Sequence, residues 1–97
     1  LEITNVVGQP FNALKMVDDK ILLTYGHRDY PYGIRSLVLN AEGTNINTAK
    51  EIILRSDGDR ADIGYPWAVH LENNTYLVVY YMRHNGVTSI LKQTITF

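Results

Sequence analysis

Two stretches of the sequence match each other: ALKMVDDKILLTY at residues 13–25 and AVHLENNTYLVVY at residues 68–80, an offset of 55 residues. Each stretch is typical of a strand, a tight turn and a second strand, with Asp18-Asp19 and Asn73-Asn74 as the turn dipeptides. The second strand of each hairpin has an uninterrupted apolar centre, which indicates burial on both faces of its sheet. We therefore expect two consecutive β-meander units that stack against neighbouring sheets.

The length of the repeat indicates the architecture. A period of about 40–55 residues with three or four strands is typical of propeller blades, which need neighbours to bury their sheet faces. The chain is predicted to be all-β, with two consecutive four-stranded antiparallel blades of a β-propeller. We expect residues 1–97 to form a partial propeller, with blades at about 8–55 and about 62–97 and with residues 1–7 in a strand of a neighbouring blade. Since propellers have about 4–8 blades, the rest lies in a longer protein or several copies self-associate through exposed blade edges.

Composition excludes several classes of function. Nine Lys and Arg against ten Asp and Glu give a net charge of −1 and a pI near 6.3, so the basic field that attracts nucleic acid is missing and no such partner is expected. The absence of cysteine removes disulfides and thiolate metal sites. No apolar run approaches the roughly 20 residues that cross a bilayer. No membrane span and no cofactor are expected.

Three stretches together resemble the bacterial sialidase (neuraminidase) superfamily of six-bladed propellers, including its sialidase-like members with BNR repeats. The first stretch combines residues 21–26 with residues 30–35, and the second, residues 39–43, looks like a degraded Asp-box. The third, residues 64–74, is similar to the start of the last blade of sialidases. Glu42 stands where the family's Asp-box has Asp, which alters a structural turn but not the chemistry. The resemblance implies a two-blade fragment from the C-terminal part of such a propeller.

The resemblance also implies exo-glycoside hydrolysis of a carboxylated sugar, with Tyr65 as the catalytic nucleophile by its place in the third stretch. A tyrosine suits such a substrate, because the negative charge of the sugar would repel a carboxylate nucleophile. In the family a Glu base and an Asp acid/base come from earlier blades, so the isolated fragment is expected to be inactive. The alternative is a tyrosine that packs at a strand start with its hydroxyl in solvent.

Arginines are expected to hold the substrate carboxylate, because a planar guanidinium binds a carboxylate through two hydrogen bonds. By the resemblance, Arg35 is the first candidate and Arg28 the second; the alternative for either is an exposed ion pair with a neighbouring carboxylate. Tyr32 and Trp67 are candidates for stacking against the sugar, with packing in or around the core as an equal alternative.

The acidic side chains Asp57, Asp59 and Asp62 lack the spacing of a calcium loop, and the histidines lack that of metal ligands, so no metal site is expected. The leading hypothesis is a fragment of a sialidase-like glycoside hydrolase that acts on glycans. The alternative is a non-catalytic propeller module that binds carbohydrate or protein. If the resemblance holds, the protein is secreted or periplasmic.

Overall fold

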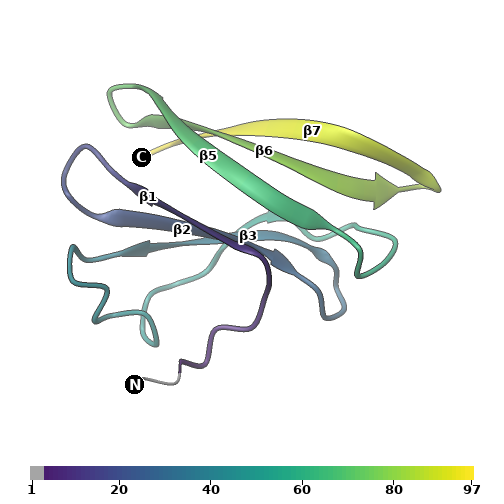
Figure 1. Ribbon diagram of the computed structural model, residues 1–97, viewed down its shortest axis with the longest axis horizontal. Helices are drawn as coiled ribbons and strands as arrows, with labels where there is room; N and C mark the ends of the chain where they lie inside the picture. The colour runs from purple at the N-terminus through teal and green to yellow at the C-terminus, as the bar shows by residue number, and fades with distance from the viewer. Residues whose placement is uncertain (1–3) are drawn as a thin grey trace.

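The computed structural model describes residues 4–97, which contain seven β-strands and no helix (Figure 1). The strands are β1 (Phe11–Lys15), β2 (Ile21–His27), β3 (Gly33–Leu39), β4 (Ile52–Arg55), β5 (Gly64–Glu72), β6 (Thr75–His84) and β7 (Val87–Thr96). They form two antiparallel meanders, a four-stranded sheet in the order β1-β2-β3-β4 and a three-stranded sheet in the order β5-β6-β7. The all-β prediction is confirmed. In this part of the chain no helix is long and apolar enough to cross a membrane.

The two matching stretches form equivalent hairpins in the two sheets. Ala13 pairs with Leu23 between β1 and β2, and the residues 55 positions later pair with each other between β5 and β6. Each turn contains one residue with a positive φ, Asp19 at 69° and Asn73 at 48°. Asp and Asn adopt this conformation more readily than most residues, which is why these dipeptides can close the hairpins.

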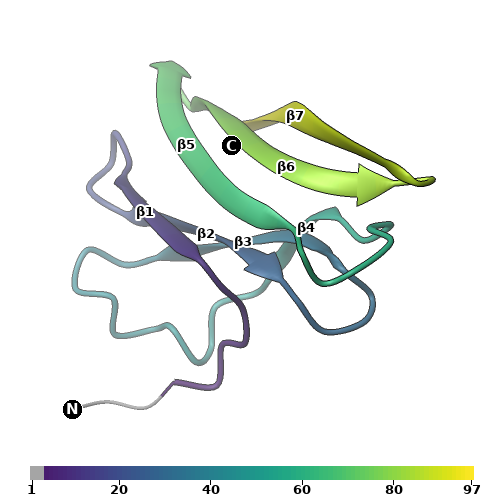
Figure 2. The same cartoon turned by 45° about the vertical axis from the view of Figure 1, so that its right-hand side comes forward.

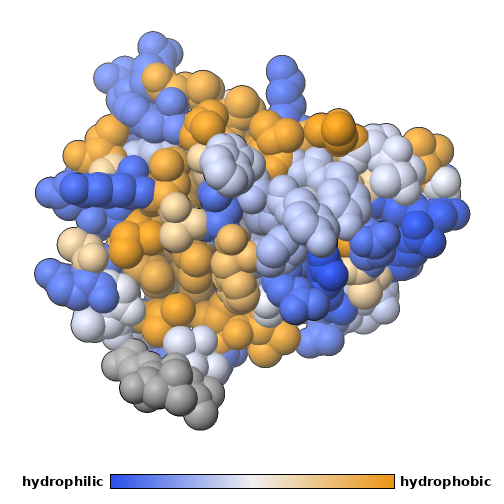
Figure 3. Space-filling model, in the orientation of Figure 1, coloured by the Kyte–Doolittle hydropathy of each residue, from blue (hydrophilic) through white to orange (hydrophobic). Residues whose placement is uncertain are grey.

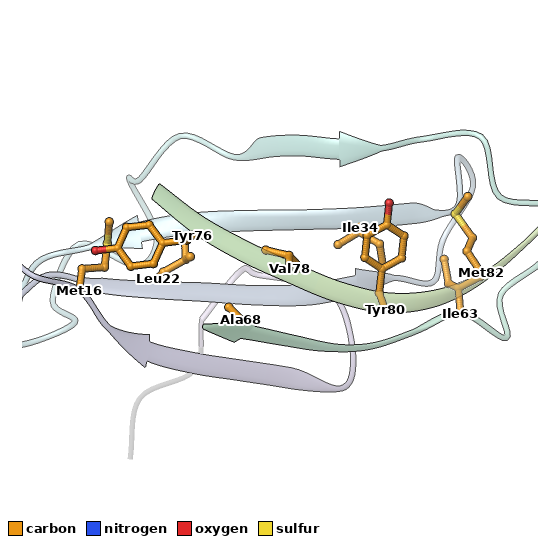
Figure 4. Close-up of a cluster of buried hydrophobic side chains, with 9 residues drawn as sticks. All are labelled: Met16, Leu22, Ile34, Ile63, Ala68, Tyr76, Val78, Tyr80 and Met82. Atoms are coloured by element: carbon orange, nitrogen blue, oxygen red, sulfur yellow. The ribbon is translucent and has the colours of Figure 1, made fainter. Parts of the chain in front are cut away.

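One face of each sheet packs against the other sheet, and Figure 4 shows the side chains that point into the space between them. The buried members of this main core are Met16, Leu22, Ile34, Ile63, Ala68, Tyr76, Val78, Tyr80 and Met82. Tyr76 is fully buried, and its hydroxyl accepts a hydrogen bond from the backbone N–H of Val17 at 3.0 Å. At roughly 1.5–3 kcal/mol for each large apolar side chain, this burial between the sheets is the main stabilising contribution.

The second sheet approaches the first most closely through β5, which lies near β1 and β2, and Figure 2 shows β6 and β7 lying successively farther away. At the closest point backbone meets backbone. A Cβ atom on Gly26 would lie 3.1 Å from the carbonyl oxygen of Ile63 and 3.2 Å from the Cα of Gly64, so a larger residue would push the sheets apart. Nearby, the side-chain oxygen of Asn12 accepts a hydrogen bond from the N–H of Ala68 at 3.0 Å. The sheets therefore form a wedge whose narrow side lies where β5 meets β1 and β2.

The second sheet differs from the prediction of four strands, because it has three. Its strands are nine or ten residues long and are separated by two-residue turns, so three of them take up residues 64–96. Residues 4–7 belong to no strand, and residues 1–3 lie outside the described residues. The strand expected at residues 1–7 and the assignment of the two sheets as propeller blades stay predictions.

The outward faces of the two sheets are covered to different extents. On the first sheet Tyr25 and Leu37 are buried beneath the segment around Val6 and the β3–β4 connection, with which they form a second, smaller core. On the second sheet Trp67 and Leu71 point outward and are exposed. Hydrophobic side chains thus remain at the surface, and Figure 3 shows hydrophobic atoms gathered across the middle of one view, with hydrophilic atoms mostly at its margins.

Candidate functional site

Four loops meet at one end of the molecule, called the loop end: residues 7–10, 28–32, 56–63 and 85–86 (right-hand side of Figure 1). Within each sheet, antiparallel pairing brings these loops to the same end, because the start of β1 or β5 lies beside the end of its partner strand. The close contact of Gly26 with Gly64 aligns the two sheets here. Arg28, Tyr32 and Tyr65, which were singled out from the sequence, therefore lie at or beside the loop end.

Tyr65 owes its orientation to a β-bulge at the start of β5. Gly64 pairs with Tyr81, and the next pair is Trp67 with Val79. Trp67 lies three residues after Gly64, whereas Val79 lies only two residues before Tyr81, so β5 has one extra residue. Tyr65 occupies the bulge with a positive φ of 46°, a backbone conformation that costs roughly 1–3 kcal/mol for a residue with a side chain. Its side chain is 64% exposed, and its ring stacks on that of Tyr81 at 5.5 Å between centroids.

Arg28 lies against this tyrosine. Its guanidinium carbon is 5.8 Å from the centre of the Tyr65 ring, within the range of a cation–π interaction. Its Nε is buried and has no hydrogen-bond partner among residues 4–97. Since buried polar groups nearly always have a partner, this N–H is a donor open to water, to a ligand or to further protein.

A hollow of about 240 Å³ opens beside Arg28. It is lined by Val7, Gly8, Gln9, Arg28 and Asp29. Pockets that enclose a whole drug-sized ligand measure about 300–1,000 Å³, so this hollow suits a polar substituent of a ligand rather than the entire molecule. The remainder of such a ligand would lie on the exposed surface beside it.

The second tyrosine of the stack is engaged by a carboxylate. The Tyr81 hydroxyl donates a hydrogen bond to Asp62 at 2.5 Å, and this bond, together with burial, raises the pKa of Tyr81. One oxygen of the Asp62 carboxylate is therefore engaged by Tyr81. Because a tyrosine nucleophile needs an adjacent base, the described residues give an aromatic pair beside an arginine rather than an activated nucleophile.

Arg35 lies on the outward face of the first sheet, where its guanidinium pairs with Glu51 at 2.9 Å. The same carboxylate accepts a hydrogen bond from the hydroxyl of Tyr25. Burial would raise the pKa of Glu51, but this hydrogen bond and the charge of Arg35 outweigh it and lower the pKa. Burial, the same hydrogen bond and the charge of Glu51 raise the pKa of Tyr25 far above its usual range. The structure does not bring Arg35 together with Tyr65.

A larger hollow, of about 320 Å³, lies on the outward face of the first sheet. Its polar lining includes His27, Asn47 and Glu51, and apolar side chains such as Leu37 complete it. The Glu51 carboxylate is already engaged by two partners, and a ring nitrogen of His27 lies 3.0 Å from the carbonyl oxygen of Pro31. The carboxylate and the imidazole of this hollow are therefore engaged within the protein, unlike the Nε of Arg28.

The two remaining aromatic candidates have different environments. Tyr32 is half-buried and packs against the main core, and the edge of its ring meets that of Tyr30 at 5.9 Å between centroids. Trp67 is 65% exposed on the outward face of β5, two residues after Tyr65. Of the two, Trp67 is the one whose ring is open to a ligand.

The acidic loop residues have partners within the protein. Arg55 donates two hydrogen bonds of 2.8 Å to Asp57 and lowers the pKa of that carboxyl. Asp59 accepts a hydrogen bond of 2.6 Å from the N–H of Gly86, which lowers the pKa of Asp59. These contacts tie the β4–β5 connection to strand β4 and to the β6–β7 turn. In the described part of the chain no group of three or more His, Asp or Glu side chains could hold a metal ion.

Sequence reasoning missed the roles of Tyr81, Asp62 and Glu51. The repeat held a usable signal for Tyr81, because the offset of 55 aligns it with Gly26 and so brings it next to the loop end. Asp62 and Glu51 lie in connections between strands, whose paths no repeating pattern predicts.

No protein-family model matches the sequence, and no curated protein matches it. A solved structure is similar to it: the crystal structure of a protein of unknown function from Dyadobacter fermentans DSM 18053, with a TM-score of 0.91 and 45% sequence identity over 96% of this chain. The match covers 26% of that protein. The chain therefore spans about a quarter of the length of the solved protein that it matches.

Proposed function

We propose that this chain is part of a longer β-propeller protein whose loop end binds carbohydrate, with Arg28 and Tyr65 as contact residues. The observation that carries the proposal is the contact of Arg28 with the exposed ring of Tyr65 beside the hollow. An aromatic ring offers an apolar face that suits the C–H surface of a sugar. A guanidinium suits a carboxylate. A carboxylated sugar is the class of ligand that satisfies both groups.

Three observations support the propeller architecture. The chain contains a structural repeat with an offset of 55 residues, each unit is an antiparallel meander, and β5, the first strand of the second unit, lies near β1 and β2 of the first unit. A propeller has such sheets arranged radially around a central channel, with their first strands innermost. The match to 26% of a longer solved chain agrees with two sheets that form part of a larger protein.

Binding is favoured over catalysis within this chain. A sialidase-type reaction requires a base for the tyrosine and a proton donor for the leaving group. The carboxylate nearest in the chain to Tyr65, Asp62, is hydrogen-bonded to Tyr81, and Arg35 is paired with Glu51. Arg28 and Asp29 line the hollow, and the Tyr65 ring lies against Arg28.

Titration of the 97-residue chain with N-acetylneuraminic acid, followed by NMR amide shifts, tests the proposal. We expect the shifts to concentrate at residues 7–10, 28–32 and 65–67. Arg28→Gln is expected to weaken binding at least about tenfold, because it removes a charge-assisted contact. Lys20→Gln, at the exposed β1–β2 turn and outside the loop end, is the control and leaves binding unchanged. Binding that is absent, or equal in Arg28→Gln and wild type, overturns the proposal.

A sialidase-like hydrolase is the second candidate, favoured by the contact between an arginine and the tyrosine that the resemblance assigns as nucleophile. A base from another blade would take the proton of the Tyr65 hydroxyl as its oxygen attacks the anomeric carbon and the bond to the aglycone breaks, and an acid would protonate the departing aglycone oxygen. Water would then cleave the bond between the sugar and Tyr65, which regains its proton. A fluorogenic sialoside tests this with the longer protein. Hydrolysis that Tyr65→Phe abolishes supports the enzyme, whereas binding without turnover supports the first function alone.

A further inference from the structure

The outward face of the second sheet is apolar and uncovered. This face, called the outer β5–β7 face, lies away from the loop end and consists of Trp67, Val69, Leu71, Leu77, Val79, Ile90, Lys92 and Thr94. Glu72 and Arg83, which pair with Thr75 and Thr88, flank it at its two ends. Leu71 is 51% exposed and Ile90 is 80% exposed. Lys92 is the one charged side chain in this set. Contiguous exposed apolar surface of this kind marks an interaction site.

The sequence repeat indicates what the face is for. The offset of 55 aligns Val69 with Leu14 and Leu77 with Leu22. In the first sheet these leucines point toward the second sheet, and Leu22 is fully buried in the main core. The outer β5–β7 face therefore repeats the positions that, one unit earlier, receive the following sheet.

The other face of each sheet shows the same relation between the two units. Tyr80 points from the second sheet toward the first, and its counterpart Tyr25 points from the first sheet away from the second. Each unit thus turns one face to the unit after it and the other face to the unit before it. Stacking of this kind has a direction and pairs unlike faces. Two copies of the chain related by a two-fold axis would pair the outer β5–β7 face with itself, which is a different contact.

We propose that the outer β5–β7 face is the docking surface for a third antiparallel sheet of the same polypeptide, one that presents alternating large side chains as β6 does toward the first sheet. The inference rests on the longer protein of the proposed function, and it is supported by the match to 26% of a solved chain. It is also continuous with the interface already formed between the two sheets, since the same repeat positions build both surfaces.

Single thiols test the proposal, because the chain has no cysteine of its own. Val69→Cys puts the thiol on the outer β5–β7 face, and Asn74→Cys puts it on the exposed β5–β6 turn as the matched control. Each variant is made in the 97-residue chain and in the longer protein and is treated with a maleimide. We expect the Val69→Cys thiol to react in the short chain and at least about tenfold more slowly in the longer protein, since a covered site reacts only when it opens. The Asn74→Cys thiol is expected to react at one rate in both.

Equal reactivity of the Val69→Cys thiol in the two proteins overturns the proposal. So does protection in the short chain that grows with concentration together with a doubled mass, because that outcome assigns the face to a second copy. If a variant fails to fold, hydrogen exchange of the wild-type β5 and β7 amides in the two proteins makes the same comparison. Sugar titration reads out residues of the loop end, so failure of sugar binding and failure of sheet docking are separate results.

Discussion

The two sheets show the same hairpin in two different settings. In the first sheet the strands are covered on both sides, by the second sheet on one face and by the segment around Val6 and the β3–β4 connection on the other. In the second sheet one face is buried and the other is bare. The first sheet is therefore covered on both faces by the chain itself, whereas the second sheet is covered on one face and exposes the other.

The largest expected effect is at the shared face. Tyr76→Ala should lower the free energy of unfolding by about 3–5 kcal/mol, because it removes a fully buried ring and leaves a cavity between the sheets. Chemical denaturation followed by circular dichroism measures the loss. Tyr76→Phe is the control, since it keeps the ring and removes only the acceptor for the Val17 N–H, at about 1 kcal/mol. Equal losses for the two variants would contradict a core centred on this ring.

A matched pair of leucines compares the outward faces directly. Leu37→Ala on the first sheet should cost about 2–5 kcal/mol, because Leu37 is buried under the chain's own segments. Leu71→Ala on the second sheet should change the free energy of unfolding by no more than about 0.5 kcal/mol. The same denaturation measurement serves for both. A similar cost at the two sites would mean that the outward faces are covered alike.

The hydrogen bond that joins the sheets is expected to contribute less. Asn12→Ala removes the acceptor of the Ala68 N–H and should cost about 1–2 kcal/mol, because a partly buried N–H is then left unpaired. Asn12→Asp keeps an acceptor oxygen and should recover most of that loss. Faster hydrogen exchange at the Ala68 amide in Asn12→Ala, and not in Asn12→Asp, would locate the effect.

The smallest effect is a dependence on pH on the first sheet. The pKa of Glu51 in the folded chain is below its ordinary value of 4.5. The contribution of Glu51 to stability is therefore complete above that value and is lost as the pH falls through the folded-state pKa. Unfolding measured between pH 7 and pH 3 should show a shallower decline in Glu51→Gln than in wild type. An equal decline in the free energy of unfolding of both proteins would show that Glu51 does not contribute to this pH dependence.

Much of the fold follows from the sequence because periodicity and turn chemistry are local. The match of residues 13–25 with residues 68–80 predicts two equivalent hairpins, and the structure has them in the same register. The number of strands in the second sheet was predicted wrongly. Strand length decides that number, and it depends on how far each strand pairs with its neighbour, which no local pattern records.

The candidate site was less predictable. The approach of Arg28 to Tyr65 depends on a contact between sheets at Gly26 and on a bulge, and both arise from the path of the chain in space. The partner of Arg35 was equally hidden, because Glu51 lies beyond a long connection. The roles that the resemblance gives to these residues stay predictions.

The meeting of Gly26 with Gly64 has a consequence for engineering. Since the tilt between the sheets is fixed by main-chain atoms, the neighbouring loops can be lengthened or recoded without moving the framework beneath them. A library that randomises residues 28–30 while both glycines are retained would therefore vary the surface of the loop end on a constant scaffold.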